Sequence, residues 1–350
     1  MQINGNGLTN KCHDGTASGN NPGSADQFAA PGLCHQVSEG RPSTYGGNNN
    51  AESSGVLTYV VIKHAGFEVV DGDELNGLTL NAVGSGTTIS HVQTYTTLDD
   101  GFEMFGGAVN LDHIVAVNVG DDSIDYSEGY VGDIQDAVVL HTSGANRCIE
   151  GDNTGGGRGD GVTPRTKLRI SNMTCITSNI DENGGANPSG KGSSEGPLFR
   201  EGATFELYNS IVTSNEATMT SNECFEIADS EGPETADFAQ AGESVAQANV
   251  IACSEATKYS CFEDENENCV VNGNENFDAA NWLAGGGAPQ VPVNGNSDNV
   301  VDETNIPYSM LITNGIGARG YLTVDGPIMD STGATVFDPT TDLFDVADLE

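Results

Sequence analysis

Two short stretches of the sequence carry the same arrangement of acidic side chains. The stretch LDDGFEMFGG covers residues 98–107, and GDDSIDYSEG follows at residues 120–129. The acids that recur at an interval of 22 residues are Asp99, Asp100 and Glu103 in the first stretch and Asp121, Asp122 and Asp125 in the second. Ca²⁺ prefers several carboxylate oxygens together with turn carbonyls. We therefore predict that these acids form a Ca²⁺ site, and a solvated acidic face without a metal is the alternative.

Paired carboxylates could also serve an enzyme. A glycoside hydrolase uses two facing carboxylates, and Asp100 with Asp122, or Glu103 with Asp125, would supply such a pair. A polysaccharide lyase would instead hold Ca²⁺ against a uronate and use a basic side chain to accept the proton. The basic residues near the acids are Arg147, Lys167, Arg169 and Arg200. A serine or cysteine nucleophile finds no support, because the cysteines are expected to be paired, and the sequence contains no phosphate-binding loop.

The acids lie between short segments that repeat along the chain. These strand-like segments cover residues 56–66, 87–97, 109–119, 132–142, 168–178 and 205–215. They align on one apolar position, which is occupied by Leu57, Ile89, Leu111, Ile134, Ile170 and Leu207. A recurring interval near 22 residues, with β-branched runs separated by Gly and Asn, is typical of a solenoid. Because neither a leucine-rich consensus nor the longer propeller unit is present, we predict an all-β, right-handed parallel β-helix with inserted loops.

Two columns of side chains follow from this alignment. The apolar column contains Phe102, Ile124, Ile149, Phe199 and Phe225, and the residues that follow them are Glu103, Asp125, Glu150, Arg200 and Glu226. Since side chains alternate along a strand, the apolar residues should face the core and their neighbours should face water. In-register residues on stacked coils lie ~5 Å apart, so the fold itself brings acids together. Such pairs are therefore weak evidence for catalysis, and we assign no catalytic residue.

A polar column lies two residues after the apolar anchor of each segment. Its members are Tyr59, His91, His113, Asp136, Asn172 and Asn209. We interpret this column as a structural stack at a bend between strands, because an aspartate and two asparagines continue it beyond the histidines. A metal pair formed by His91 and His113 is the alternative.

Composition limits the partners. Asp and Glu number 51 against 12 Lys and Arg, which gives a net charge of −39 and argues against nucleic acid and anionic membrane surfaces as partners. Only 36% of residues are hydrophobic and 46 are Gly, so a thin core of stacked strands fits better than a thick globular one. No apolar run reaches the ~18 residues of a membrane-spanning helix.

The cysteines point to an oxidising compartment. Eight are present, without the paired CxxC spacing of a zinc site. Pairing in sequence order predicts disulfides Cys12–Cys34, Cys148–Cys175, Cys224–Cys253 and Cys261–Cys269. Such a pattern favours an extracellular or outer cell-surface protein. Because no signal peptide precedes MQINGNG, we expect the sequence to be a processed or partial chain.

Several motifs resemble those of one family. YGG, YVVIKHAG, ELNGLTL, GSGTTI and DDGFEMFGG occur in that family's order between residues 45 and 230. The family comprises exported bacterial proteins, mostly described as hypothetical proteins or lipoproteins, that look like right-handed β-helices. The resemblance implies this fold and an extracellular location, but no activity and no catalytic residue. Family members usually carry further coils before the point where this sequence starts, so an open N-terminal end of the solenoid is expected.

These observations give a domain plan and a function. Residues 1–50 are expected to form a loop-rich, disulfide-closed segment, 51–270 the β-helix, and 271–350 a loop-rich segment with a hairpin near 321–339 that caps the helix or docks to a neighbour. We predict a structural or binding protein of the cell exterior, which serves surface display, adhesion or filament assembly through self-assembly or a cell-surface partner. A polysaccharide lyase or glycoside hydrolase acting on an extracellular polysaccharide is the alternative.

Overall fold

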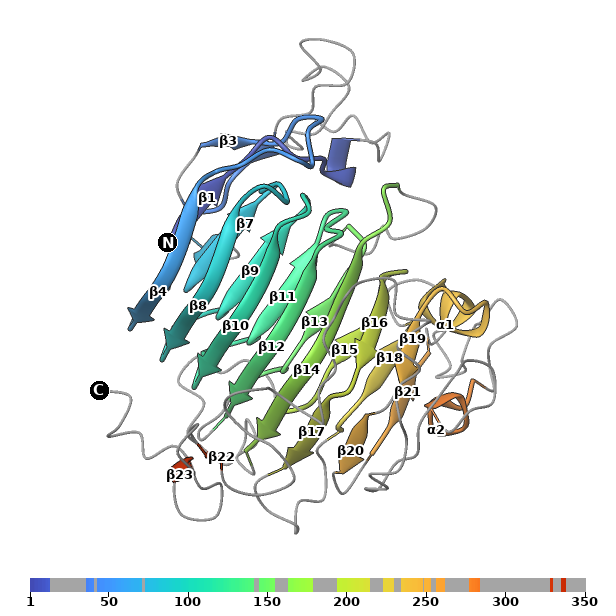
Figure 1. The fold of residues 1–350 in the computed structure, drawn as a ribbon. Coiled ribbons are helices and arrows are strands. Elements are labelled where there is room, and N and C mark those ends of the chain that lie inside the picture. Colours follow the sequence, from blue (N-terminus) through green and yellow to red (C-terminus); the bar gives the residue numbers. More distant parts are fainter. Residues whose placement is uncertain are drawn as a thin grey trace.

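The body of the molecule is a stack of β-coils (Figure 1). The computed structural model describes residues 1–12, 36–40, 43–70, 73–141, 145–154, 163–178, 194–214, 223–229, 234–247, 249–252, 256–261, 277–283, 328–329 and 335–337.

The first sheet has eight strands, and all neighbours pair in parallel. In spatial order they are β1 (Gln2–Asn4), β7 (Leu78–Asn81), β9 (Phe102–Phe105), β11 (Ile124–Ser127), β13 (Glu150–Gly151), β15 (Leu198–Phe199), β18 (Glu226–Ala228) and β21 (Lys258–Ser260).

The second sheet is also parallel and takes the alternate strand of each coil. Its strands are β4 (Val56–Lys63), β8 (Thr88–Tyr95), β10 (Asn110–Val117), β12 (Asp133–Leu140), β14 (Lys167–Thr177), β16 (Thr204–Tyr208) and β19 (Val245–Gln247), with β17 (Ile211–Ser214) and β20 (Val250–Ala252) continuing beside β14. The predicted right-handed parallel β-helix is confirmed.

Short antiparallel pairs lie outside the coils. They are β2 (Gln36–Val37) with β3 (Thr44–Tyr45), β5 (Phe67–Val70) with β6 (Asp73–Leu75), and β22 (Ile328–Met329) with β23 (Thr335–Phe337). The last pair lies where the hairpin near 321–339 is expected. The boundaries of the predicted segments at 50/51 and 270/271 stay predictions.

The predicted apolar anchors stack in register. Leu57 pairs with Ile89, Ile89 with Leu111, and Leu111 with Ile134. The column continues through Ile170 and Leu207. Ile89, Leu111, Ile134, Ile170 and Leu207 are buried, so the alignment of the sequence segments is confirmed.

The predicted polar column marks a sharp bend within each long strand of the second sheet. All of its members have a left-handed backbone, with φ of 56° at Tyr59, 54° at His91, 52° at His113, 59° at Asp136, 57° at Asn172 and 49° at Asn209. Because non-glycine residues rarely adopt this conformation, its repetition at one register position defines the bend. The Asn209 side-chain amide donates to Asn172 Oδ1 at 2.7 Å, which confirms the stack at this point.

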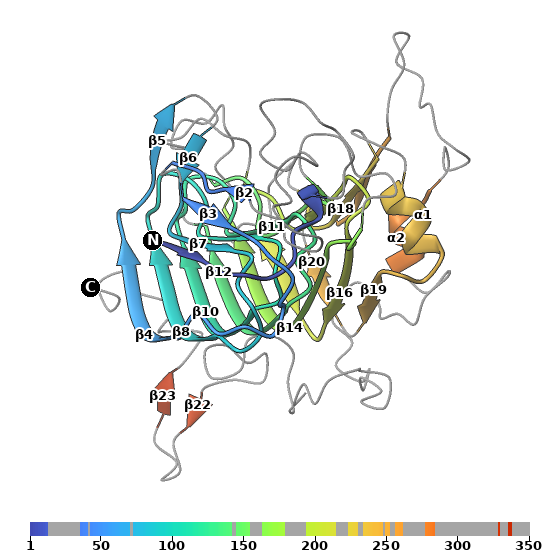
Figure 2. The ribbon, with the colours of Figure 1, turned by 90° about the horizontal axis from the view of Figure 1, so that it is seen from above.

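Aromatic side chains fill the core at the late coils, where two helices lie beside the last strands. Helices α1 (Glu234–Gln240) and α2 (Ala279–Asn281) lie at the end of the stack near β19 and β21 (Figures 1 and 2). Trp282 stacks on Phe225 at 6.2 Å between ring centroids, and its indole N–H donates to Ala239 O at 2.9 Å. The Phe199 and Phe205 rings stack at 3.7 Å. The helices therefore shield this end of the core.

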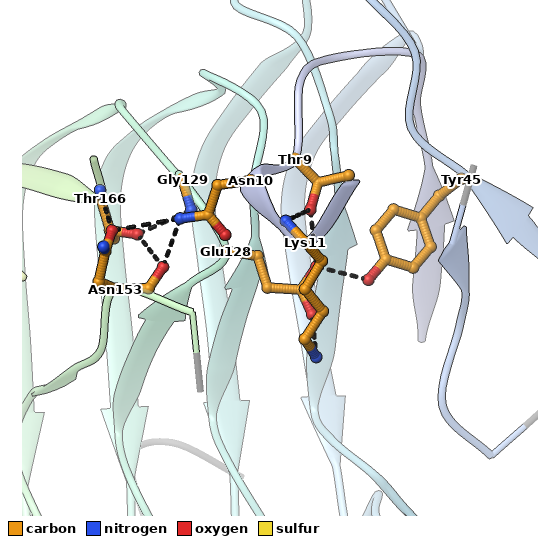
Figure 3. Close-up of polar contacts among 8 residues, drawn as sticks. All are labelled: Thr9, Asn10, Lys11, Tyr45, Glu128, Gly129, Asn153 and Thr166. Carbon is orange, nitrogen blue, oxygen red and sulfur yellow. Dashed lines mark hydrogen bonds and ion pairs between the residues drawn. The ribbon is translucent and has the colours of Figure 1, made fainter. Parts of the chain in front are cut away.

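The first twelve residues run across successive coils (Figure 3). Gly5 N donates to Asn81 O, Gly107 N to Leu8 O, and Asn10 N to Glu128 O, each at 2.7–2.8 Å. The segment ends in the 3₁₀ helix η1 (Asn10–Cys12). It therefore ties together the bends that follow β7, β9 and β11.

One predicted disulfide lies wholly within the described residues. Cys148 and Cys175 are bonded to each other, as predicted. Cys224 and Cys261 are also in disulfides, whereas Cys34, Cys253 and Cys269 lie outside the described residues. In the described part of the chain, no helix is long and apolar enough to cross a membrane.

Candidate metal centre

Two columns of polar side chains run along the outside of the first sheet. The entry column lies just before each strand and contains Asn76, Asp100, Asp122, Arg147, Glu195 and Glu223. The strand column lies three residues later and contains Thr79, Glu103, Asp125, Glu150, Leu198, Glu226 and Lys258. Side chains from successive coils therefore meet at the spacing of neighbouring strands.

The strand column corrects one predicted register. Leu198, and not Arg200, pairs with Glu150 and with Glu226. Phe199 instead pairs with Gly151, and the space beside Gly151 is filled by the Tyr126 ring. The predicted alignment of Phe199 with Ile149 is therefore wrong by two positions. Arg200 does not belong to the strand column. Phe102, Ile124, Ile149, Phe199 and Phe225 are all buried, as predicted.

The entry column is linked by hydrogen bonds between coils. Asp100 N donates to Asn76 Oδ1 at 3.1 Å, and Asp122 N donates to Asp100 Oδ1 at 2.9 Å. Arg147 N donates to Asp122 Oδ1 at 2.7 Å. Each of these side chains therefore accepts a hydrogen bond from a backbone N–H of the next coil. This gives Asp100 and Asp122 a structural role, and it uses one oxygen of each carboxylate.

Most of the predicted acids do not face water. Asp99, Asp100, Glu103 and Asp122 are only 8%, 6%, 8% and 3% exposed. Asp121 and Asp125 are partly exposed. The expectation of a solvated ladder is wrong for the four buried acids, because in-register side chains cover one another and Asn76 donates directly to Glu103 Oε2.

Burial and mutual repulsion make these carboxyl groups hard to ionise. Burial raises the pKa of Asp100, and the Asp125 and Glu103 carboxylates raise it further. Burial also raises the pKa of Glu103, with Glu39 and Asp125 adding to the shift. The pKa values of Asp122 and Asp125 are raised by burial and then by Glu150. Joint ionisation of these acids is therefore unfavourable, and bound protons or a cation would relieve it.

Three groups of carboxylates could each hold one ion. In each group, one oxygen from every member lies within 4.8 Å of the others. The groups are Asp99, Asp100 and Asp121; Asp100, Glu103 and Asp125; and Asp122, Asp125 and Glu150. All of the predicted metal ligands belong to such a group. Glu150 was missed because its sequence, CIEGDN, lacks the DD pair that identifies the other two coils.

Arg147 and Arg200 pair with acids of the later coils. Arg200 Nη2 lies 2.7 Å from Glu150 Oε2, and Arg200 Nε lies 2.7 Å from Asp152 Oδ1. Arg147 Nη2 lies 2.6 Å from Glu195 Oε2 and 2.8 Å from Glu226 Oε2.

On the two earlier coils, the acids are not paired with basic side chains in this way. Among the described residues, Asp100, Glu103, Asp122 and Asp125 take part in no Lys or Arg salt bridge. Lys167 and Arg169 lie on the second sheet, where they pair with Glu206 at 2.6 Å and Asp133 at 2.5 Å.

Comparison with known proteins identifies the fold family. A family model described as the pectate-lyase-like β-helix domain matches residues 17–286. No curated protein and no solved structure matches the chain.

Proposed function

Because the chain belongs to the pectate-lyase-like β-helix family, we propose that it is a Ca²⁺-binding protein of the cell exterior. In this proposal it acts by binding a partner and not by turnover. Its acidic face carries the binding function, and an anionic polysaccharide is the partner whose chemistry fits, since Ca²⁺ can bridge carboxylates of two molecules. The exterior location is supported by the Cys148–Cys175 disulfide and by the disulfide-bonded Cys224 and Cys261.

The main observation in support of Ca²⁺ binding is the uneven distribution of charge along the first sheet. The late coils place Arg147, Arg200 and Lys258 beside their acids. The two earlier coils place Asp100, Glu103, Asp122 and Asp125 together with strongly raised pKa values. A divalent cation would relieve this repulsion, because these four acids form no Lys or Arg salt bridge in the described part of the chain.

The donor set suits Ca²⁺. The groups that contain Asp125 supply only carboxylate oxygens, and Ca²⁺ takes 6–8 oxygen ligands from carboxylates, carbonyls and water. Asp100, Glu103 and Asp125 would hold the ion, whereas Glu150 of the neighbouring group is already paired with Arg200. When bound, the ion would supply a positive charge able to bind an anionic group of the partner.

The basic side chains favour binding over elimination chemistry. A lyase needs a side chain that can accept a proton. Burial alone would lower the pKa of Arg200, but Asp152 and Glu150 raise it above the usual arginine value. The pKa of Arg147 is likewise raised by Glu195 and Glu226, against the effect of burial. Neither guanidinium is therefore suited to act as a base.

Calcium binding can be tested by calorimetry and thermal unfolding at fixed high ionic strength. In chelator, Asp125→Asn should unfold at a higher temperature than the native chain, because it removes one repelling charge. In saturating Ca²⁺ the order should reverse, because ligand at about 100 times Kd stabilises by about 2.7 kcal/mol. Glu243→Gln removes a charge from an exposed position and is the matched control for a change of carboxylate to amide within the acid groups. A midpoint that is equal in Ca²⁺ and chelator contradicts the metal proposal.

A polysaccharide lyase or glycoside hydrolase is the second candidate. It is favoured by the family and by Arg200, whose charge acts on Asp125 at the edge of the acid groups. Purified chain should be incubated with acidic and neutral polysaccharides in the presence of Ca²⁺. Unsaturated products or new reducing ends, abolished by Arg200→Lys or Glu103→Gln but not by Glu243→Gln, would replace the binding proposal. Retention of the polysaccharide by the chain, without unsaturated products or new reducing ends, supports the binding proposal.

A further inference from the structure

The bend of the second sheet brings two histidines and an aspartate together, away from the acidic face. His91 lies on β8, and Asp112 and His113 lie on β10, where Asp112 pairs with Ser90. The left-handed backbone at both histidines points equivalent rings the same way. The His91 and His113 rings are 4.6 Å apart at their centroids and only 3° from parallel.

A chain of close polar contacts joins the δ edges of the two rings. His113 Nδ1 lies 2.8 Å from Asp112 Oδ1. Ser90 Oγ donates to Asp112 Oδ2 at 3.3 Å and lies 2.7 Å from His91 Nδ1. These contacts bring two ring nitrogens and a carboxylate together at one place on the bend.

We propose that His91, Asp112 and His113 bind a transition-metal ion of the Zn²⁺ class. One ligand atom from each residue lies within 4.8 Å of the other two. Two nitrogens and one carboxylate oxygen form a donor set that zinc accepts, with water in the remaining position. His113 and Asp112 have 27% and 47% of their side-chain surfaces exposed, so an ion can enter from solvent.

Binding requires the two rings to turn from their present stacked arrangement. Zn–N bonds of about 2.0–2.1 Å place two tetrahedral ligand atoms roughly 3.3 Å apart. The rings must therefore turn toward each other at their δ edges. Both side chains are partly exposed at the bend, so a rotation about χ2 does not require the strands to move.

Asp136 supplies the outer support that such a site needs. It is the next residue of the polar column, is fully buried, and places Oδ2 3.8 Å from His113 Nε2. A metal at Nδ1 leaves the His113 proton on Nε2, which then points to this carboxylate. A histidine that binds a metal through one nitrogen and a carboxylate through the other is the usual arrangement at protein metal sites.

The column itself does not require histidine. Asn172 and Asn209 hold the same left-handed conformation and stack through an amide hydrogen bond. At the position of Asp112, the neighbouring coils carry Ser90 and Gln135. Two adjacent imidazoles with an acid between them therefore go beyond what the bend needs.

Zn²⁺ binding to the full chain, measured by calorimetry in excess Ca²⁺, tests the proposal. Excess Ca²⁺ occupies the acidic face and leaves the histidine site to Zn²⁺. We expect one equivalent of Zn²⁺ that binds at least ~10-fold more weakly in His91→Asn and His113→Asn, and in Asp136→Asn through loss of the outer carboxylate. Asparagine is native at other positions of this column, so the histidine variants should fold. His64→Asn is the matched control, because His64 has the same left-handed backbone but lies outside the site.

Cu²⁺ electron paramagnetic resonance gives an independent measurement on the same proteins. Coupling to two imidazole nitrogens is expected in the native chain and in His64→Asn, and coupling to one in His113→Asn. Zn²⁺ affinity that is equal in the native chain, His91→Asn and His113→Asn means adventitious binding to carboxylates and overturns the proposal. A Cu²⁺ spectrum without nitrogen coupling also overturns it.

Discussion

Lys11 Nζ lies 2.6 Å from Glu128 Oε1 and joins the end of the N-terminal segment to a bend of the β-helix (Figure 3). Glu128 is only 1% exposed and has a left-handed backbone with φ of 55°. Its Oε2 accepts hydrogen bonds from Tyr45 Oη at 2.8 Å and Thr9 Oγ1 at 3.0 Å. One buried carboxylate therefore holds two separate N-terminal segments on the coils.

Removing the charge of Lys11 should loosen this attachment. In Lys11→Met, Glu128 stays buried without its ion pair, and we expect a loss of about 1–3 kcal/mol in the free energy of unfolding. Urea unfolding of Lys11→Met, Glu128→Gln and the double variant measures the coupling. The double variant should lose less than the sum of the two single variants. Strict additivity would mean that the pair does not stabilise the fold.

A side chain at Gly151 should disturb the inward column beside Phe199. A Cβ at this position would lie 2.4 Å from the Tyr126 hydroxyl oxygen. Because Tyr126 is fully buried, it cannot move aside without disturbing its neighbours. We expect Gly151→Ala to lower the free energy of unfolding by about 1–3 kcal/mol, as overpacking usually does. A Cβ would also lie 2.5 Å from Tyr126 Cζ, so the combination with Tyr126→Leu, which removes the ring, should recover part of this loss, and no recovery would contradict the proposed clash.

The apolar columns of the two sheets separate what the sequence could predict from what it could not. Leu57, Ile89 and Leu111 recur with the period of the coil, so periodicity alone placed them in one stack. Local spacing does not determine where an inserted loop rejoins the sheet. The long insertion before β15 therefore hid the pairing of Leu198 with Glu150.

The burial of the acids could not be predicted from the sequence, for a different reason. Alternation along a strand separates core-facing from outward side chains, but it does not say whether an outward side chain is covered. Glu103 is outward and still buried, because Asn76 from the preceding coil contacts it. Contacts between coils also create the Arg147–Glu195 ion pair, whose partners lie in loops of unlike sequence.

Glu195 and Glu223 should make stability depend on pH. Burial and a hydrogen bond with Glu223 raise the pKa of Glu195 to about 9, although Arg147 opposes the shift. Burial alone would raise the pKa of Glu223, but hydrogen bonds with Glu195 and Lys258 lower it to about 2. Between the ordinary glutamate pKa of about 4.5 and about 9, the folded pair keeps one proton that the unfolded chain has lost. Its contribution to stability therefore falls as pH rises through this window.

Glu195→Gln should remove this dependence, because the amide keeps the hydrogen bond to Glu223 and does not titrate. Urea unfolding at a series of pH values should give the native chain a steeper decline than the variant. The difference in slope should approach about 1.4 kcal/mol per pH unit, which corresponds to one proton. Parallel curves would mean that the two carboxyl groups do not share a proton in the folded chain.

Calcium and protons should compete for the acidic face. Burial and mutual repulsion raise the pKa values of Asp100, Glu103, Asp122 and Asp125. In chelator, the folded chain therefore binds more protons than the unfolded chain, and the contribution of these acids to stability falls as pH rises above their unfolded values. Ca²⁺ needs ionised ligands, so the stabilisation that it gives should grow over the same range. Thermal unfolding with Ca²⁺ and with chelator across pH measures both trends. Glu103→Gln should reduce the pH dependence of the Ca²⁺ effect, whereas Glu243→Gln should leave it unchanged. A Ca²⁺-induced shift that is independent of pH would place the ion elsewhere on the surface, away from carboxylates that compete for protons.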